Sequence, residues 1–144
     1  MSVSASIDII LSEKKTAVEI INRLMNFGWT LATKDGYIGY LPLGDKDDFH
    51  WQAEKISFEA LTKILHEKER ANEIVGVTMT WKDTEIGGSF LFWRNDSLET
   101  FSMCTDGNRQ RTILDGNYEI TDFQWYLAKL LPPLDVEYFS FYQI

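Results

Sequence analysis

The sequence predicts a single α+β domain, in which about three helices pack on a mostly antiparallel sheet. Three segments carry apolar residues at helical spacing and have capping residues at their ends. Between them, short alternating segments are joined by tight turns, which connect antiparallel strands but cannot make parallel crossovers. With 144 residues, 44% of them hydrophobic, the chain can build one core over residues 1–144. The expected order is β-α-β-β-α-β-β-β-β-α-β.

The first strand and the first helix are predicted at the N-terminus. Residues 6–11, SIDIIL, are rich in β-branched side chains and favour a strand. A helix should follow and end at Gly28, a residue suited to a left-handed C-terminal cap. Ser12 is one candidate N-cap; the alternative is Thr16, which forms a capping box with Glu19 and starts the helix four residues later.

A hairpin and a second helix come next. Residues 29–43 contain Asp35-Gly36, a pair that favours a tight hairpin turn. Ser57 is expected to cap the second helix, residues 57–71. Its apolar stripe consists of Phe58, Leu61 and Leu65. Its other face, which we expect to be solvated, consists of Lys63, Glu67, Lys68 and Arg70.

The second half reads as a meander of short strands. Residues 73–81 alternate, with Val75, Val77, Met79 and Trp81 on one face. Turns are expected at residues 82–88, 94–96, 105–108 and 114–117.

A third helix and a last strand close the chain. Thr121 or Asp122 should cap the helix, residues 123–131, and Pro132-Pro133 should end it. Residues 135–144, DVEYFSFYQI, form a strand that must be tied into the sheet, because so apolar an exposed edge would aggregate.

The overall charge bears on the kind of partner. The net charge is −8, made of −2 over residues 1–71 and −6 over residues 72–144. Such a field repels nucleic acids and anionic membranes and attracts a basic protein. Five Trp, six Tyr and nine Phe exceed what a small core holds, so some rings should lie at the surface.

Cysteine content and the N-terminus predict the compartment. Cys104 is the only cysteine, so no internal disulfide can form. The first residues, MSVSASIDIILSEKK, lack the basic region of a signal peptide and the length of a membrane span. A reducing cytoplasm is therefore expected.

The stretch GDKDDFHW, residues 44–51, has the residue types of a metal site but not the spacing of a known one. A calcium loop starting at Asp45 would need an oxygen ligand at Phe49 and glutamate at Ile56. Zinc would need further imidazole or thiolate ligands near His50. A hard-cation site from Asp45, Asp47, Asp48 and a distant carboxylate stays open as an alternative, but the sequence favours no metal and no cofactor.

Catalytic signatures are likewise missing from the pattern. Cys104 reads as a small hydrophobic residue of a strand, and Gly87-Gly88 reads as a hairpin turn or a bulge rather than a phosphate loop. An acid–base pair of His50 and His66 would need cations for phosphate, for which Arg109 and Arg111 are the candidates. We expect no catalytic residue, and a protein that is not an enzyme.

Acidic residues beside aromatic residues suggest a binding surface instead. Carboxylates steer a cationic partner, and rings anchor the complex. The predicted partner-binding residues are Asp45, Asp47, Asp48, Trp51, Asp83 and Glu85.

In format the chain resembles the bacterial immunity proteins of contact-dependent growth inhibition and other polymorphic toxin systems. The resemblance rests on its acidic loops such as GDKDDFHW, on the meander VTMTWKDTEIGGSFLFWRNDSLETFSMC and on the apolar tail VEYFSFYQI. It implies a protein that binds a cognate toxin, such as a basic nuclease domain, and neutralises it. The resemblance carries no family residue to a position in this chain.

Two other functions fit the same sequence. A small-molecule or enzymatic site could use the open sheet face or a pocket beneath a helix, lined by Trp, Tyr and Arg111. Alternatively, a dimeric adaptor or regulatory subunit could bury its surplus rings against a second copy. The sequence leaves the oligomeric state open.

Overall fold

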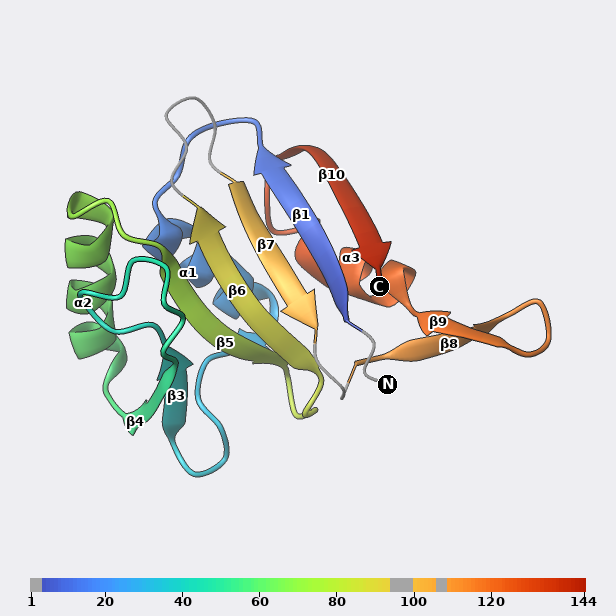
Figure 1. Ribbon diagram of the computed structural model, residues 1–144, viewed down its shortest axis with the longest axis horizontal. Coiled ribbons are helices and arrows are strands. Elements are labelled where there is room, and N and C mark those ends of the chain that lie inside the picture. The colour runs from blue at the N-terminus through green and yellow to red at the C-terminus, as the bar shows by residue number, and fades with distance from the viewer. Residues whose placement is uncertain (1–3, 94–99, 106–108) are drawn as a thin grey trace.

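The computed structural model describes residues 4–93, 100–105 and 109–144 (Figure 1). It confirms the α+β class and the predicted order of elements, with short strands β4 and β9 in addition. The helices are α1 (Ala17–Phe27), α2 (Phe58–Arg70) and α3 (Phe123–Leu130). The strands are β1 (Ala5–Leu11), β2 (Trp29–Thr30), β3 (Tyr37–Tyr40), β4 (Gln52–Lys55), β5 (Val75–Trp81), β6 (Gly87–Trp93), β7 (Thr100–Thr105), β8 (Arg111–Leu114), β9 (Tyr118–Thr121) and β10 (Val136–Gln143).

The main sheet has the strand order β10-β1-β7-β6-β5-β3-β4, with β2 also paired to β5. Every strand pairing described is antiparallel. Strands β5, β6 and β7 form the first part of the predicted meander, and β1 lies between β7 and β10. The meander does not continue into β8 as expected, because β8 pairs with β9 in a separate sheet. Because the last strand returns to the first, Ser4 and Ile144 exchange backbone hydrogen bonds of 3.2 and 2.9 Å.

One face of the sheet forms the core. Helices α1 and α3 lie behind this face in Figure 1, and α2 lies beside the β3–β5 end. Alternate residues of the strands point into this layer, as the sequence pattern predicts. They include Ile7, Ile9, Val75, Val77, Met79, Phe90, Phe92, Phe101 and Met103, all buried. None of the helices in the described residues covers the opposite face of β1, β7 and β6 (Figure 1).

Local capping decides where the helices begin. The Thr16 hydroxyl accepts a hydrogen bond from the Glu19 backbone N–H at 3.2 Å. Thr16 rather than Ser12 is therefore the N-cap of α1, as the capping-box alternative predicts. Ser57 caps α2 and Asp122 caps α3 in the same way.

The predicted hairpin at residues 29–43 takes a different form. Strands β2 and β3 hardly pair with each other; both pair with β5, one after the other along its edge. A single bridge between Ala32 and Ile38 closes the turn, in which Gly36 has the predicted positive φ of 84°. The free edge of β5 is long enough to take both strands, so this long-range pairing replaces the local one. The expected turns at 94–96 and 105–108 lie wholly or mostly outside the described residues.

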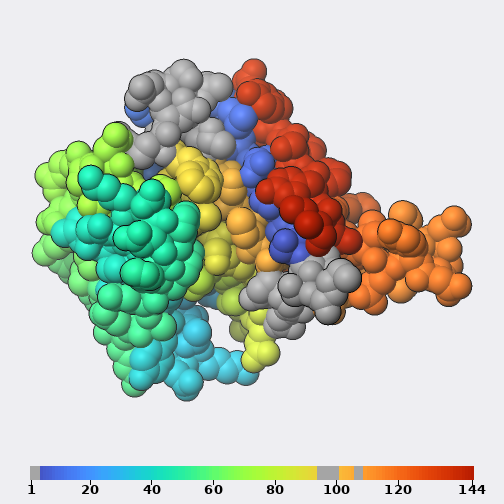
Figure 2. All heavy atoms as spheres, viewed as in Figure 1, coloured from blue at the N-terminus to red at the C-terminus, as the bar shows by residue number. Residues whose placement is uncertain are grey.

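The C-terminal part adds two features at one side of the sheet. Strands β8 and β9 form a separate two-stranded hairpin that projects from the body (Figures 1 and 2). Strand β10 is tied to β1 along one edge, as predicted. No strand in the described parts of the chain pairs with its other edge.

Candidate binding surface

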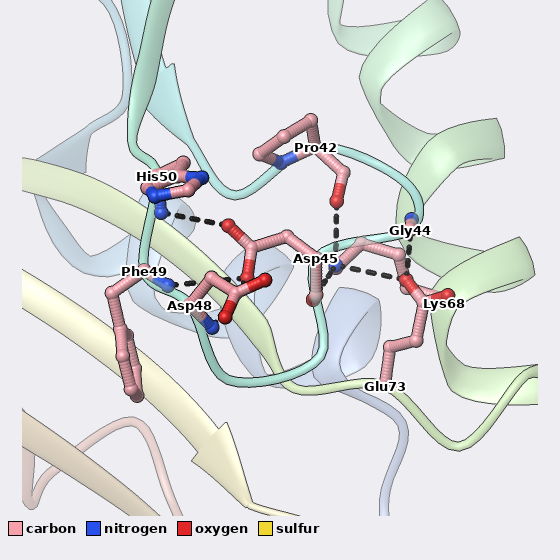
Figure 3. Close-up of polar contacts among 8 residues, drawn as sticks. All are labelled: Pro42, Gly44, Asp45, Asp48, Phe49, His50, Lys68 and Glu73. Carbon is pink, nitrogen blue, oxygen red and sulfur yellow. Dashed lines mark hydrogen bonds and ion pairs between the residues drawn. The ribbon is translucent and has the colours of Figure 1, made fainter.

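The loop of residues 42–51 connects β3 to β4 and contains the acidic stretch singled out in the sequence (Figure 3). The loop folds around the side chain of Lys68 from α2, which is fully buried, with an exposed fraction of 0%. The expectation that Lys68 lies on a solvated face is therefore wrong. Its Nζ donates hydrogen bonds to the carbonyl oxygens of Pro42 and Asp45, both at 2.8 Å, and to Glu73 Oε1 at 3.1 Å.

Glu73 completes this buried ion pair. Its Oε1 also accepts the backbone N–H of Gly44 at 2.8 Å. The three protons of the ammonium group therefore each have an acceptor, which is the condition for keeping a charge inside a protein. The pair attaches the loop to the C-terminal part of α2 and to the segment that leads into β5.

Asp45 organises the loop from within. Its Oδ1 accepts the backbone N–H groups of Asp48 and Phe49, at 2.9 and 3.1 Å, and its Oδ2 accepts that of His50 at 2.7 Å. Burial alone would raise the pKa of this carboxyl, but the three hydrogen bonds and the nearby Lys68 ammonium outweigh it and lower the pKa below 3.8. Asp45 is thus a buried residue that builds the loop, and its carboxylate does not form part of the exposed acidic surface.

The other side chains of the loop point outward. Asp47 and Asp48 are exposed, and the rings of Phe49 and Trp51 are 38% and 36% exposed. Phe49 has a φ of 56°, in the left-handed region that a bulky residue rarely adopts. This conformation turns three successive N–H groups toward Asp45. The three hydrogen bonds to Asp45 compensate the energetic cost of this backbone conformation, and the Phe49 ring stays at the surface.

Gly76 of β5 lets the loop lie against the sheet. A Cβ at this position would stand 2.7 Å from Leu41 Cδ1 and 2.9 Å from Trp51 Cη2, closer than atoms can pack. Glycine leaves room for both side chains, and any larger residue would require one of them to shift. Part of the Trp51 ring is therefore fixed on the sheet while the rest is exposed.

The remaining predicted residues, Asp83 and Glu85, belong to a different surface. They follow Trp81, which ends β5, and five residues, or roughly 17 Å of strand, separate Trp81 from Gly76. The ammonium groups of Lys82 and Lys129 lie 5.0 and 5.4 Å from the centre of the Trp81 ring. That ring already contacts cations of its own chain, so the acid–aromatic surface is concentrated on the loop.

The histidines and arginines considered for catalysis lie on different parts of the molecule. His50 and His66 belong to the loop and to α2, whereas Arg111 lies on the projecting hairpin at the other side of the molecule (Figure 1). Arg111 forms an ion pair with Glu119 at 3.2 Å, so it is not on the open sheet face either. Arg109 is buried, and its Nε donates to Thr121 Oγ1.

Neither a metal cluster nor a membrane-spanning helix is present in the described parts of the chain. The described residues contain no cluster of three or more His, Cys, Asp or Glu side chains able to hold a metal ion. In the same residues, no helix has the length and apolar character required to cross a membrane.

A polar row on the open sheet face was not anticipated from the sequence. The Trp93 indole Nε1 donates to Ser102 Oγ at 3.1 Å, and Ser102 Oγ donates to Asp8 Oδ1 at 2.6 Å. The three residues come from β6, β7 and β1, so only the strand order brings them together. Alternation places each of them on the polar face, but it does not say which strands are neighbours.

Comparisons of the chain with protein families, with curated proteins and with solved structures found no match to any of them.

Proposed function

We propose that this protein is a cytoplasmic inhibitor that binds and neutralises a basic toxin, such as a nuclease domain, by protein–protein association. The observation that carries the proposal is the loop of residues 42–51. It presents two carboxylates, Asp47 and Asp48, beside two rings, Phe49 and Trp51, on a backbone fixed by buried polar contacts.

A fixed loop suits tight association. Ordering a mobile loop on binding subtracts from affinity, and the contacts of Lys68, Glu73 and Asp45 order this loop beforehand. The rings supply anchors that lose water on contact, and the carboxylates attract a cationic surface. The net charge of −8 adds a long-range attraction to the positive surface that a nuclease presents to phosphate.

The test is capture of a partner from the cells that make this protein, followed by binding kinetics with the purified partner. We expect one basic protein to stay bound through a high-salt wash. Asp47→Asn with Asp48→Asn should slow association several-fold and flatten its salt dependence. Phe49→Asn removes a ring but tolerates the positive φ, so it should speed dissociation while the loop stays folded.

A matched control is offered by the other acidic turn. Asp83→Asn with Glu85→Gln removes the same charge from a distant surface and should leave the kinetics nearly unchanged. Retention of no basic protein, or equal effects of the two charge pairs, would contradict the assignment of the loop.

A second function, binding of a small polar ligand, is favoured by the row Asp8–Ser102–Trp93. It offers a carboxylate, a hydroxyl and an indole on a sheet face without a covering helix. Thermal-shift screening would support it if a ligand raises Tm in the wild type and fails to do so in Asp8→Asn.

A further inference from the structure

The two edges of the main sheet are built differently. Strand β4 is a short edge of four polar or small residues, including Glu54 and Lys55, which is how proteins keep an edge from pairing. Strand β10 has eight residues, and Glu137 is its only charged one. Four of its rings are exposed, with fractions between 41% and 55%: Tyr138, Phe139, Phe141 and Tyr142. A long, apolar and exposed edge of this kind is expected to pair with another strand.

The backbone of β10 is ready to pair. Ser4 and Ile144 exchange hydrogen bonds, and the register with β1 is regular from residue 143 back to residue 138. Such bonds alternate along an antiparallel pair, so the backbone N–H and C=O groups of even-numbered residues such as Ser140 point toward β1. The N–H and C=O groups of Phe139, Phe141 and Gln143 therefore point to the open edge of β10, the last strand at that end of the sheet in Figure 1.

The sequence of this strand is almost the same in both directions. Residues 136–144 read VEYFSFYQI, with Ser140 at the centre. If two such strands run antiparallel with Ser140 opposite Ser140, each of the remaining residues lies opposite a residue of the same or a similar type. Phenylalanine meets phenylalanine, tyrosine meets tyrosine, valine meets isoleucine, and Glu137 meets Gln143 rather than another carboxylate.

We propose that β10 pairs with β10 of a second copy around a two-fold axis at Ser140, so that the two sheets become one. Phe139 and Phe141 exchange backbone hydrogen bonds with Phe141 and Phe139 of the second copy. Tyr138 lies against Tyr142 of the second copy on the open face. Two-fold symmetry requires a surface that complements itself, and a strand with this order of residues does so.

The contact area is extended by the β8–β9 hairpin. About half of each of the four rings is exposed, which gives about 400 Å² at ~200 Å² a ring, against ~800 Å² per partner in a standard interface. The hairpin exposes Ile113, Leu114 and Tyr118 and is held near the end of β10 because Thr121 donates two hydrogen bonds to Gln143 Oε1. In the dimer this end lies beside the start of the other β10. There an open groove of about 490 Å³ extends from Leu131 to Phe139.

Cross-linking at the two-fold axis tests the arrangement. Ser140 opposite itself is a pair without hydrogen bonds between the strands, with Cα atoms about 4.5 Å apart, within reach of a disulfide. Ser140→Cys should form a covalent dimer under mild oxidation. Tyr142→Cys is the matched control, because its Cα atoms in the two copies lie about 13 Å apart and should not cross-link. Light scattering at roughly 100 µM should give the mass of a dimer for the wild type.

A charge exchange tests the register. Tyr138→Lys with Tyr142→Lys brings like charges together and should give a monomer, whereas Tyr138→Lys with Tyr142→Glu brings opposite charges together and should keep the dimer. Circular dichroism shows whether each variant is folded. A wild type that is monomeric throughout, or a Ser140→Cys variant that cross-links no faster than Tyr142→Cys, would overturn the proposal. The variants leave the loop of residues 42–51 intact, so this outcome is separate from partner capture.

Discussion

At the scale of single residues, Lys68 shows how a charged side chain can be part of a core. Its place in α2, three residues after Leu65, puts it on the buried stripe, yet its type suggests solvent. The ammonium group is accommodated because Glu73 and two carbonyl oxygens surround it. A buried ion pair of this kind fixes the loop in one conformation, and it becomes costly only when one partner is lost.

Lys68→Met should therefore lower the free energy of unfolding by about 3 kcal/mol, because Glu73 and two carbonyl groups lose their buried donor. Urea denaturation at neutral pH measures the change. Lys63→Met, on an exposed position of the same helix, should change it by less than about 0.5 kcal/mol. Adding Glu73→Gln to Lys68→Met should recover part of the loss. Equal effects of the two lysine substitutions would contradict this role.

Asp45 makes stability depend on pH in the acid range. Its pKa is lower in the folded protein than its ordinary value of 3.8, so the unfolded chain binds the proton more tightly. The stabilisation is complete above the unfolded value and is lost as the pH falls from about 4 through the folded pKa. Urea midpoints between pH 7 and pH 2.5 should fall less steeply for Asp45→Asn than for the wild type. Parallel curves would show that the carboxylate does not carry the effect.

At the scale of elements, the sequence predicts what short-range chemistry decides. The caps at Thr16, Ser57 and Asp122 were all among the predicted residues, because a cap involves only the next three positions. The pairing of β2 and β3 with β5 depends on a strand more than 30 residues away in the chain, so a local turn signal could not indicate it.

The same contrast between short-range and long-range determinants applies to the candidate site. Composition singled out the stretch from Asp45 to Trp51, but it gave Asp45 an outward role, whereas the side chain is buried. What turned this carboxylate inward is the alignment of three N–H groups, which follows from the backbone at Phe49. The burial of Lys68 depends on a loop that precedes α2 in the sequence, and neither stretch alone reveals it.

The contact between the loop and β5 can be tested at Gly76. Gly76→Ala places a methyl group where Leu41 and Trp51 pack, so we expect a loss of about 1–3 kcal/mol in the free energy of unfolding. The displaced indole should also become more accessible to a fluorescence quencher. Trp51→Ala in the Gly76→Ala background should relieve part of the loss, since one of the two clashing side chains is removed. A variant as stable as the wild type would show that the loop does not rest on the strand.

At the scale of the whole molecule, the two proposed surfaces lie at opposite ends of the strand order of the main sheet. The loop of residues 42–51 lies at the β3–β5 end of the sheet, and β10 is the last strand at the other end (Figures 1 and 2). A dimer through β10 would therefore leave both loops accessible and hold them far apart. Each copy could bind one partner, so the stoichiometry of the complete assembly would be two to two.

Dimerisation through β10 also links stability to concentration. Folded chains that associate are removed from the folding equilibrium, so Tm rises with protein concentration. A tenfold rise adds about 1.4 kcal/mol per dimer, or ~0.7 kcal/mol per chain, which for a chain of 144 residues corresponds to about 2 °C. Scanning calorimetry over a hundredfold range should show this slope for the wild type and for Tyr138→Lys with Tyr142→Glu. The repelling pair, Tyr138→Lys with Tyr142→Lys, should unfold at one temperature at all concentrations. A wild-type Tm that does not change with concentration would mean that its folding does not depend on a second copy.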